Sequence, residues 1–484
     1  MSNKKSIFII LALSFATHLA FFGHPNETVF DEVHFGKFVS GYYTGEYYFD
    51  IHPPLGKLII AGFAKIVDFK SEYNFTEIGK EFPDNKYLAL RFLPAIAGTL
   101  LPLIIFLLTL ELGISRMAAF AGGLLLIFEN SLLTQSRLML LDQFLLLFGF
   151  TSLLFYFKYH NQSNIRYLIL QSSPDPAKLG QETIPRKNVG MFSVFWKWNS
   201  NLFFMAVFAG LAVSIKWTGL SFIALPILIE VAKTLKIPET LKTAIKLTIV
   251  SFMAVLRMAS FFLISFIIYF LVFALHFALL PNPGLGDAFM KPNFRENNIV
   301  KNIWDLNTEM YKSNQRLMAS HPYSSQFYTW PLMARPIFYW VKDNARIYFF
   351  GNPVVWWSST IAVIYFMFDF FRNKKNYTYW LLVIGYWLNL LPFIGVKRVM
   401  FLYHYLTALI FAILILVYLI DPERTNGHDK SRPTSYGASK IKKRLLAGLV
   451  IASIAAFLFF APLSYGLPLS EKAYNARIWF ASWR

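Results

Sequence analysis

The chain has 484 residues, of which 56% are hydrophobic and only 15% charged, a composition too apolar for a series of soluble domains. Its formal net charge of +19 is compatible with nucleic-acid binding, but in membrane proteins Lys and Arg collect in the cytoplasmic loops instead. The absence of Cys excludes disulfides, Cys-ligated zinc and thiolate nucleophiles. The composition therefore predicts an integral membrane protein.

Apolar runs of about 17–25 residues indicate membrane-spanning helices, because only a helix satisfies its own backbone hydrogen bonds inside hydrocarbon. The first run follows Lys4 and Lys5 as in a signal peptide, but Phe22-Gly23-His24-Pro25 offers no small-residue cleavage site, so we expect a retained first span. We predict an all-α polytopic membrane protein with about eleven spans. The expected spans are approximately 6–23, 87–110, 117–133, 138–157, 202–216, 218–235, 247–278, 353–371, 377–395, 399–420 and 445–464.

A cytoplasmic N-terminus places the most basic loops in the cytoplasm, in agreement with the positive-inside rule. This orientation explains the positive charge without nucleic acid. The segment 421–444, rich in Lys, Ser, Gly and Asn, is expected to be a flexible cytoplasmic connector. The basic residues of these loops are Lys158, Arg166, Lys178, Arg186, Lys187, Lys197, Lys233, Lys236, Lys242, Lys246, Arg372, Lys374, Lys375, Lys440, Lys442, Lys443 and Arg444.

Two long segments, at about 24–86 and 279–352, fall on the external side. Both mix aromatic residues, Pro and Gly with apolar stretches such as Leu55 to Phe63, which indicates amphipathic helices lying on the outer membrane face. No repeat of fixed period is visible, so residues 1–484 are predicted to form a single membrane domain. The first segment carries about ten of the 27 acidic residues: Glu27, Asp31, Glu32, Glu46, Asp50, Asp68, Glu72, Glu77, Glu81 and Asp84.

The first external segment concentrates residues capable of acid–base chemistry. Asp31, Glu32 and Asp50 lie within about twenty residues. Pro53-Pro54 stiffens the backbone behind Asp50 and His52, because both rings fix φ and hold the preceding residue extended. A carboxylate close to apolar surface is a candidate general base for removing a hydroxyl proton. The alternative is an ordinary solvated loop, against which the flanking aromatic residues argue.

The pattern Asp-Glu-x-His-Phe at 31–35, followed by Phe-Asp-x-His-Pro-Pro-Leu-Gly-Lys at 49–57, resembles the first external loop of the protein O-mannosyltransferase family. The resemblance covers roughly residues 20–410. The second external segment has no room for the β-trefoil domain inserted in eukaryotic members, so the similarity is to bacterial members. It implies a C-type glycosyltransferase fold. The other segments similar to family motifs, in the same order, are Tyr87 to Phe92, Ser136 to Asp142, Lys216 to Leu220, Gly286 to Met290 and Leu402 to Leu406.

The resemblance implies transfer of mannose from a polyprenyl-phosphate carrier to Ser or Thr hydroxyls of secreted or membrane proteins, with inversion at the anomeric carbon. A single inverting displacement needs a base at the acceptor hydroxyl and stabilisation of the departing lipid phosphate. We predict that Asp31 is the base. Glu32, the other acid of the catalytic pair, and Asp50 are expected to orient acceptor or sugar hydroxyls.

Cationic side chains at the outer ends of spans are expected to meet the phosphate. Arg suits this role because its guanidinium donates two parallel hydrogen bonds. Structural alternatives are pairing of Arg137 with Asp142, and interfacial snorkelling of Lys397 and Arg398. For histidines beside aromatic residues, the alternative is a structural hydrogen bond. The candidates are Arg91, Arg137, Lys397 and Arg398, with His52 and His321 as further donors.

The sequence has neither a Gly-rich phosphate loop after a strand nor an Asp-x-Asp pair, the features of nucleotide-sugar enzymes. A lipid-linked donor is therefore expected, without a metal or other cofactor. The expected partners are polyprenyl-phosphate mannose, an acceptor polypeptide emerging from the membrane and membrane lipids, but no nucleic acid. The expected location is a bacterial plasma membrane, or the ER membrane in a eukaryote, with the active site on the external face.

Two other functions remain open. A related transferase would glycosylate a lipid such as lipid A, although the segment Gly286 to Met290 and the Asp31-Glu32 pair favour a protein acceptor. A transporter or flippase would carry charges near the membrane midplane, whereas the candidate residues gather at one face.

Overall fold

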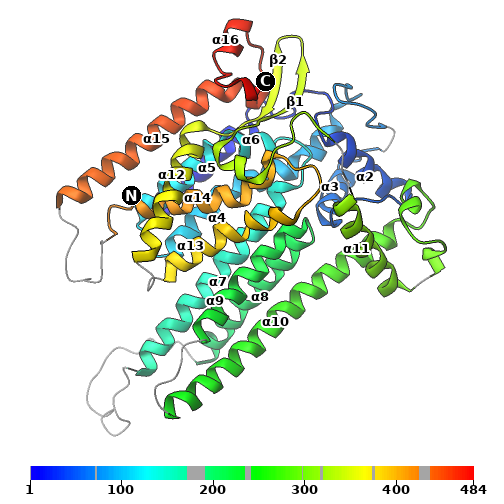
Figure 1. Cartoon of the computed structure of the whole chain (residues 1–484). Helices are drawn as coiled ribbons and strands as arrows, with labels where there is room; N and C mark the ends of the chain where they lie inside the picture. Colours follow the sequence, from blue (N-terminus) through cyan, green and yellow to red (C-terminus); the bar gives the residue numbers. More distant parts are fainter. Residues whose placement is uncertain are drawn as a thin grey trace.

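The computed structural model describes residues 2–484 except 71–72, 172–190, 235–240, 297, 317–319, 373–376 and 425–435. It is a helical bundle with a small β-hairpin at one end (Figure 1). The helices are α1 (Asn3–Leu19), α2 (Glu32–Thr44), α3 (Leu55–Ile66), α4 (Leu88–Glu111), α5 (Arg116–Ile127), α6 (Asn130–Ser136), α7 (Asp142–Gln171), α8 (Met191–Val213), α9 (Ser221–Thr234), α10 (Leu241–Leu279), α11 (Ile299–Arg316), α12 (Pro353–Arg372), α13 (Tyr377–Leu388), α14 (Leu406–Leu419), α15 (Tyr436–Tyr465) and α16 (Glu471–Asn475).

The chain is a multi-pass membrane protein. Among the described residues, five helices are long and apolar enough to cross a membrane, and a sixth span results if α5 and α6, bent by 57° relative to each other, are counted together. Three further apolar helices are shorter than this length. The expected number of about eleven spans therefore stays a prediction. The five long helices are Asn85–Glu111, Arg257–Leu279, Thr378–Gly395, Leu402–Leu419 and Gly437–Tyr465.

α14 lies inside the bundle, where it packs against α5, α12 and α13. Every residue from Leu406 to Tyr418 is buried. α10 and α15 are covered far less and expose large apolar side chains, among them Phe262, Phe266 and Leu458. Helices that are apolar all round are typical of protein cores or membrane spans, so the outward faces of α10 and α15 are suited to contact with lipid.

The two long segments predicted to be external lie at the same end of the bundle. α2 and α3 of the first segment and α11 of the second are on the right of Figure 1. α11 buries Ile303, Leu306 and Met310 and exposes Trp304, as expected for an amphipathic helix. The prediction that both segments contain helices is confirmed.

A β-hairpin, β1 (Ile337–Lys342) and β2 (Ala345–Phe349), is an addition that the all-α prediction lacked. β1 consists mainly of β-branched and aromatic residues, which favour strands. Lys342 pairs with Ala345, so Asp343 and Asn344 form a two-residue turn, and Asp343 has a positive φ of 51°. Asp and Asn tolerate this conformation. The hairpin signal was therefore present in the sequence within a segment interpreted as helical.

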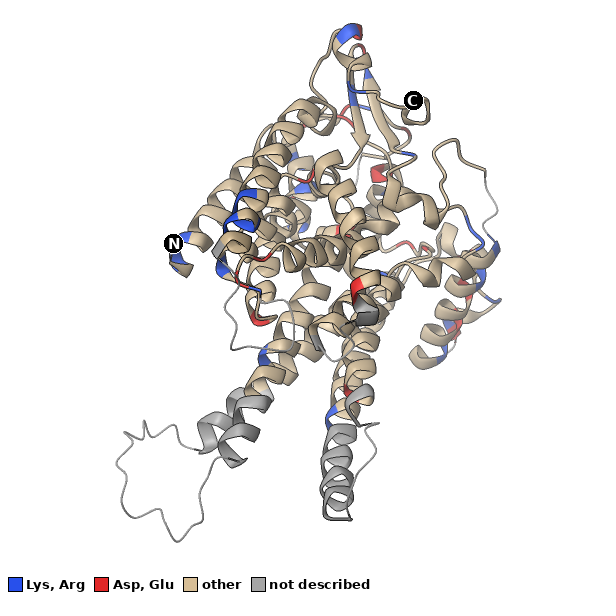
Figure 2. Cartoon of the chain, turned by 60° about the vertical axis from the view of Figure 1, so that its left-hand side comes forward, with Lys and Arg blue, Asp and Glu red and all other residues tan. Residues whose placement is uncertain are grey.

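The predicted orientation rests on the charge distribution, part of which the structure describes. In Figure 2 charged residues lie mainly towards the ends of the helices and the connecting segments. The basic residues 440–444 lie on the first turns of α15, near the N-terminus and away from α2 and α11 (Figure 1). The predicted connector 421–444 is thus shorter than expected, because α15 begins at Tyr436. Lys178, Arg186, Lys187, Lys236, Lys374 and Lys375 lie outside the described residues.

Candidate active site

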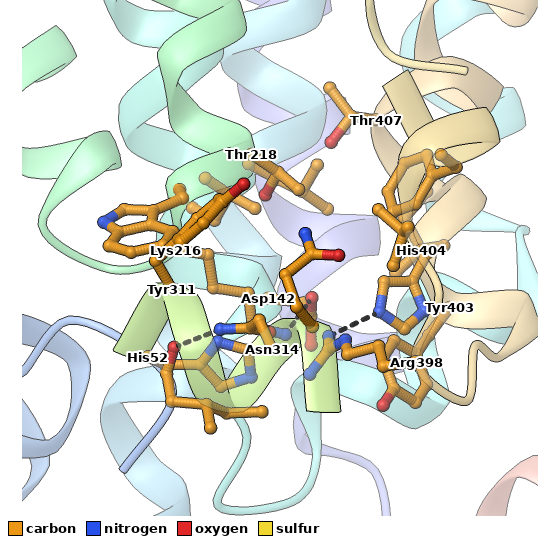
Figure 3. Close-up of a pocket in the computed structure, with 18 residues that line it drawn as sticks. His52, Asp142, Lys216, Thr218, Tyr311, Asn314, Arg398, Tyr403, His404 and Thr407 are labelled. Carbon is orange, nitrogen blue, oxygen red and sulfur yellow. Dashed lines mark hydrogen bonds and ion pairs between the residues drawn. The ribbon is translucent and has the colours of Figure 1, made fainter. Parts of the chain in front are cut away.

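A cavity of about 220 Å³ lies where α7, α11 and the turns before α9 and α14 meet the first external segment (Figure 3). One part of its wall is apolar, with Leu145, Leu146 and Phe393. The other part is polar and converges from five separate stretches of chain. The polar lining includes His52, Asp142, Lys216, Asn314, Arg398 and His404.

Lys216 and Asp142 form an ion pair at the cavity wall. Lys216 Nζ donates to Asp142 Oδ1 at 2.7 Å, and the ammonium group lies 5.3 Å from the centre of the Tyr403 ring. Gln135 Nε2 donates to the other oxygen of Asp142, at 2.7 Å. An ammonium group has three N–H donors, and the pair with Asp142 is the one hydrogen bond of Nζ among the described residues. Lys216 therefore has donor capacity for a ligand in the cavity.

Arg398 supplies a second cation to the cavity. Its guanidinium donates to His404 Nε2 at 3.0 Å (Figure 3). Because Arg can only donate, His404 Nε2 accepts, and its Nδ1–H is left to donate to the Phe401 carbonyl at 2.9 Å. The His404 ring also stacks on buried Trp330, at a centroid distance of 5.7 Å. His404 is thus held in one orientation and in turn orients Arg398 towards the cavity.

Asp31 directly precedes α2 and is close to these groups. Among the described residues its carboxylate accepts no hydrogen bond, and it does not cap the helix. Burial raises the pKa of Asp31 to about 7, and the charges of Asp142 and Asp50 add to that effect while Lys216 and Arg398 oppose it. A carboxylate with its pKa near 7 and free acceptor positions meets the requirements for a general base.

Glu32 and Arg91 form a fully buried pair away from the cavity lining, and this placement does not support their predicted roles. Arg91 Nε donates to Glu32 Oε1 at 2.8 Å and its NH2 group donates to Oε2 at 2.6 Å. The remaining Arg91 donors bond to the carbonyl oxygens of Gly23, Pro25 and Glu27. Glu32 also accepts from the backbone N–H groups of Val29 and Met139. All five donors of Arg91 and all four acceptor positions of Glu32 are used. None is left for the hydroxyl of the acceptor substrate or for the lipid phosphate.

Arg137 also has a structural environment rather than the predicted phosphate site. Its guanidinium donates to the carbonyls of Ala20 and Phe21, just beyond the end of α1, and it lies 4.6 Å from the Tyr465 ring centre. The alternative, an ion pair with Asp142, is not formed among the described residues, where Asp142 pairs with Lys216. Arg137 therefore bonds to carbonyl groups of the turn that follows α1.

Asp50 and His52 have different surroundings. Asp50 forms an ion pair with Lys57, which also donates to the His52 carbonyl at 2.9 Å. Lys57 is almost fully buried, and burial lowers its pKa. The His52 side chain lines the cavity, where burial and the positive charges of Lys216 and Arg398 lower its pKa well below the usual range. Neutral His52 can donate or accept one hydrogen bond towards a ligand.

The last two predicted residues lie outside the cavity lining. The backbone N–H of Tyr323 donates to His321 Nδ1 at 3.2 Å, and the His321 ring packs edge-on against Phe401. Lys397 is exposed. The structure thus brings Asp31, His52 and Arg398 together but not His321 or Lys397. It adds Asp142, Lys216 and His404, which occur in the motifs 136–142, 216–220 and 402–406 but were not selected as site residues.

A second, mostly apolar cavity of about 330 Å³ adjoins the first. It shares Trp217, Thr218 and His404 with the first cavity and extends along Leu220, Ala224 and Leu388. The two cavities together offer cationic groups next to an apolar space. This combination suits a molecule with an anionic head and a hydrocarbon tail.

Two family models match the chain. Residues 8–171 match the model for dolichyl-phosphate-mannose-protein mannosyltransferase, and residues 299–483 match the model for the C-terminal four-span region of protein O-mannosyltransferase. The chain belongs to the protein O-mannosyltransferase family. The family models confirm the resemblance seen in the sequence motifs.

The curated relatives are considerably longer than this member of the family. Dolichyl-phosphate-mannose–protein mannosyltransferase 4 of Schizosaccharomyces pombe is 32% identical over 334 residues, which are 66% of this chain and 39% of the relative. Protein O-mannosyltransferase 1 of Drosophila melanogaster is 42% identical over 139 residues, 28% of this chain and 16% of the relative. The chain therefore spans well under two thirds of the length of these relatives.

Solved structures agree on the fold. The Saccharomyces cerevisiae protein O-mannosyltransferase Pmt1–Pmt2 complex bound to the sugar donor superposes with a TM-score of 0.83 at 18% identity, covering 100% of this chain and 93% of that chain. ArnT from Cupriavidus metallidurans bound to undecaprenyl phosphate gives a TM-score of 0.53 at 11% identity, covering 96% and 77%. The fold is thus the C-type glycosyltransferase fold that the family resemblance implied.

Proposed function

We propose that this protein transfers mannose from a polyprenyl-phosphate carrier to Ser or Thr hydroxyls of a polypeptide, with inversion at the anomeric carbon. Membership of the protein O-mannosyltransferase family and the names of the relatives support this function over transfer to a lipid or transport. The observation that carries the proposal is the position of Asp31, an unpaired carboxylate beside a cavity that contains Lys216 and Arg398.

In this mechanism Asp31 accepts the proton of the acceptor hydroxyl. The oxygen forms a bond to the anomeric carbon while the bond from that carbon to the phosphate oxygen breaks, and the lipid phosphate leaves with the electron pair. Attack from the face opposite the leaving group inverts the carbon. Lys216 and Arg398 stabilise the charge on the departing phosphate, because fixed cations in a partly dry cavity act most strongly where charge develops.

In this proposal the sugar donor binds with its phosphate at Lys216 and Arg398 and with its hydrocarbon chain in the adjoining apolar cavity. His52 and Asn314 are then available for sugar hydroxyls. Asn314 already donates to the Ile51 carbonyl at 3.2 Å, which leaves its amide oxygen as an acceptor. Asp50 acts indirectly, since its ion pair with Lys57 stabilises the segment that carries His52.

We place the reaction on the external face of a bacterial plasma membrane. The cavity lies next to the segments 24–86 and 279–352, and the basic part of α15 lies at the other side of the bundle. We also propose that no metal is needed, because two cations already meet the phosphate. Activity abolished by a chelator and restored by a divalent ion would contradict this part of the proposal.

The test is transfer of radiolabelled mannose from polyprenyl-phosphate mannose to a Ser/Thr-rich peptide, in membranes containing the protein or its Asp31→Asn variant. We expect labelled peptide with the unaltered protein and a loss of about 10²–10⁴-fold in the variant, the usual contribution of a general base. Label retained by the variant would exclude Asp31 as the base. Label in lipid instead of peptide would reject the protein acceptor.

A further inference from the structure

The β-hairpin reaches the candidate site through Tyr339 of β1. The Tyr339 ring stacks on Phe30 with centroids 3.9 Å apart and planes inclined by 10°. Its hydroxyl donates to Gln135 Oε1 at 2.8 Å. Tyr339 is therefore in direct contact with the residue before Asp31 and with the side chain that holds Asp142.

The Tyr339 ring packs against a residue with a strained backbone, Phe30. Its φ of 47° lies in the left-handed region, which bulky residues rarely adopt unless the surroundings enforce it. The Asp31 carboxylate has no hydrogen bond of its own among the described residues. Its orientation is therefore set by the backbone, and the Phe30–Tyr339 stack stabilises that backbone.

The hydroxyl determines which way Gln135 faces. Burial holds the pKa of Tyr339 well above its usual range, so the hydroxyl stays protonated and can donate. With Oε1 accepting from Tyr339, Gln135 directs Nε2 to Asp142 Oδ2 at 2.7 Å. Asp142 Oδ1 then accepts from Lys216 at 2.7 Å. A reversed Gln135 amide would direct its oxygen at the carboxylate and weaken the placement of Lys216.

We propose that Tyr339 is a positioning residue that aligns the two halves of the reaction. Its ring holds the backbone that carries Asp31, at the acceptor, and its hydroxyl holds Asp142 and Lys216, at the donor phosphate. The inference rests on the proposed function and adds the hairpin to the machinery of the site. Two substitutions test the role of the ring and the role of the hydroxyl separately.

Tyr339→Phe keeps the ring and removes the hydroxyl. The Kd of the purified full chain for polyprenyl phosphate is expected to rise about tenfold, because the Gln135 oxygen loses its donor and Lys216 is less well held. Because Lys216 also stabilises the departing phosphate, kcat at saturating donor should fall as well. Phe30→Leu should lower kcat and change its pH profile while the Kd for polyprenyl phosphate stays the same.

The matched control is Tyr348→Phe in β2. It removes a hydroxyl bonded to the Tyr474 hydroxyl at 2.7 Å, away from the cavity, and neither Kd nor kcat should change. Gln135→Met removes the Tyr339 link from the other side and is the second variant if Tyr339→Phe does not fold. It should raise the Kd similarly.

A double-mutant cycle distinguishes positioning from general destabilisation. If Tyr339 acts through Lys216, Tyr339→Phe should have no further effect on the Kd in a Lys216→Gln background. Additive effects, or an unchanged Kd in Tyr339→Phe, would overturn the inference. The Kd is measured without turnover, so a protein that binds polyprenyl phosphate but transfers no mannose would reject the proposed function separately.

Discussion

Two acid–base pairs of this protein have similar chemistry and different surroundings. Glu32 and Arg91 are fully buried, and every donor and acceptor of the pair has a partner within the fold. Lys216 and Asp142 lie at a cavity wall, and Lys216 keeps donors without a partner among the described residues. The first pair joins the first external segment to α4, whereas the second faces the space that a ligand can enter.

Unsatisfied hydrogen-bonding capacity, rather than charge, thus distinguishes a binding group from a structural one. A buried charge is tolerated only when it is paired and hydrogen-bonded. Once all its partners come from the protein, it has nothing left for a substrate. Asp31 and its neighbour Glu32 illustrate the same difference within a single dipeptide.

The largest effect on stability is expected from Glu32→Gln. The amide NH2 group would face donors of Arg91 and of the backbone, and Arg91 would lose its counter-charge, at a cost of about 3–5 kcal/mol in the free energy of unfolding. Thermal unfolding in detergent measures this loss. The control is Glu81→Gln, whose exposed pair with Lys342 should contribute little. Equal unfolding temperatures for both variants would show that the buried pair is not a structural link.

A smaller stability effect but a clear binding effect is expected from Lys216→Gln. The substitution removes the ammonium group next to the donor phosphate, and charge-assisted hydrogen bonds contribute about 1.5–3 kcal/mol, so the Kd for polyprenyl phosphate should rise about 10- to 100-fold. Titration with polyprenyl phosphate measures it. Unchanged binding together with strong destabilisation would place Lys216 in the same class as Arg91.

A third effect, visible only when the pH is changed, is expected from Asp31. In the folded protein its pKa is raised to about 7 from a usual value near 3.8. Between these values the folded protein holds a proton that the unfolded chain has released, so this group lowers stability as the pH rises towards 7 and beyond. Asp31→Asn removes that dependence. Its unfolding temperature should therefore exceed that of the unaltered protein at pH 8 by more than at pH 4, and a difference independent of pH would contradict the raised pKa.

Sequence patterns located the segments that form the site but did not distinguish its binding residues from its structural ones. The Asp-Glu-x-His-Phe motif identified the segment that carries Asp31, and the motifs at 136–142, 216–220 and 402–406 contain the remaining cavity residues. Arg91 and Arg137 were chosen for phosphate because Arg suits it. Only the structure shows that their guanidinium groups bond to carbonyl oxygens near the end of α1.

The sequence by itself determined that the protein lies in a membrane, its family and the two long segments at 24–86 and 279–352, because apolar run length and motif order can be read without coordinates. The tertiary structure decided which ionisable groups are satisfied. Hydrogen-bond partners come from residues far apart in the chain, such as Met139 for Glu32 and Tyr339 for Gln135. A side chain's free capacity depends on those partners, and no local pattern records them.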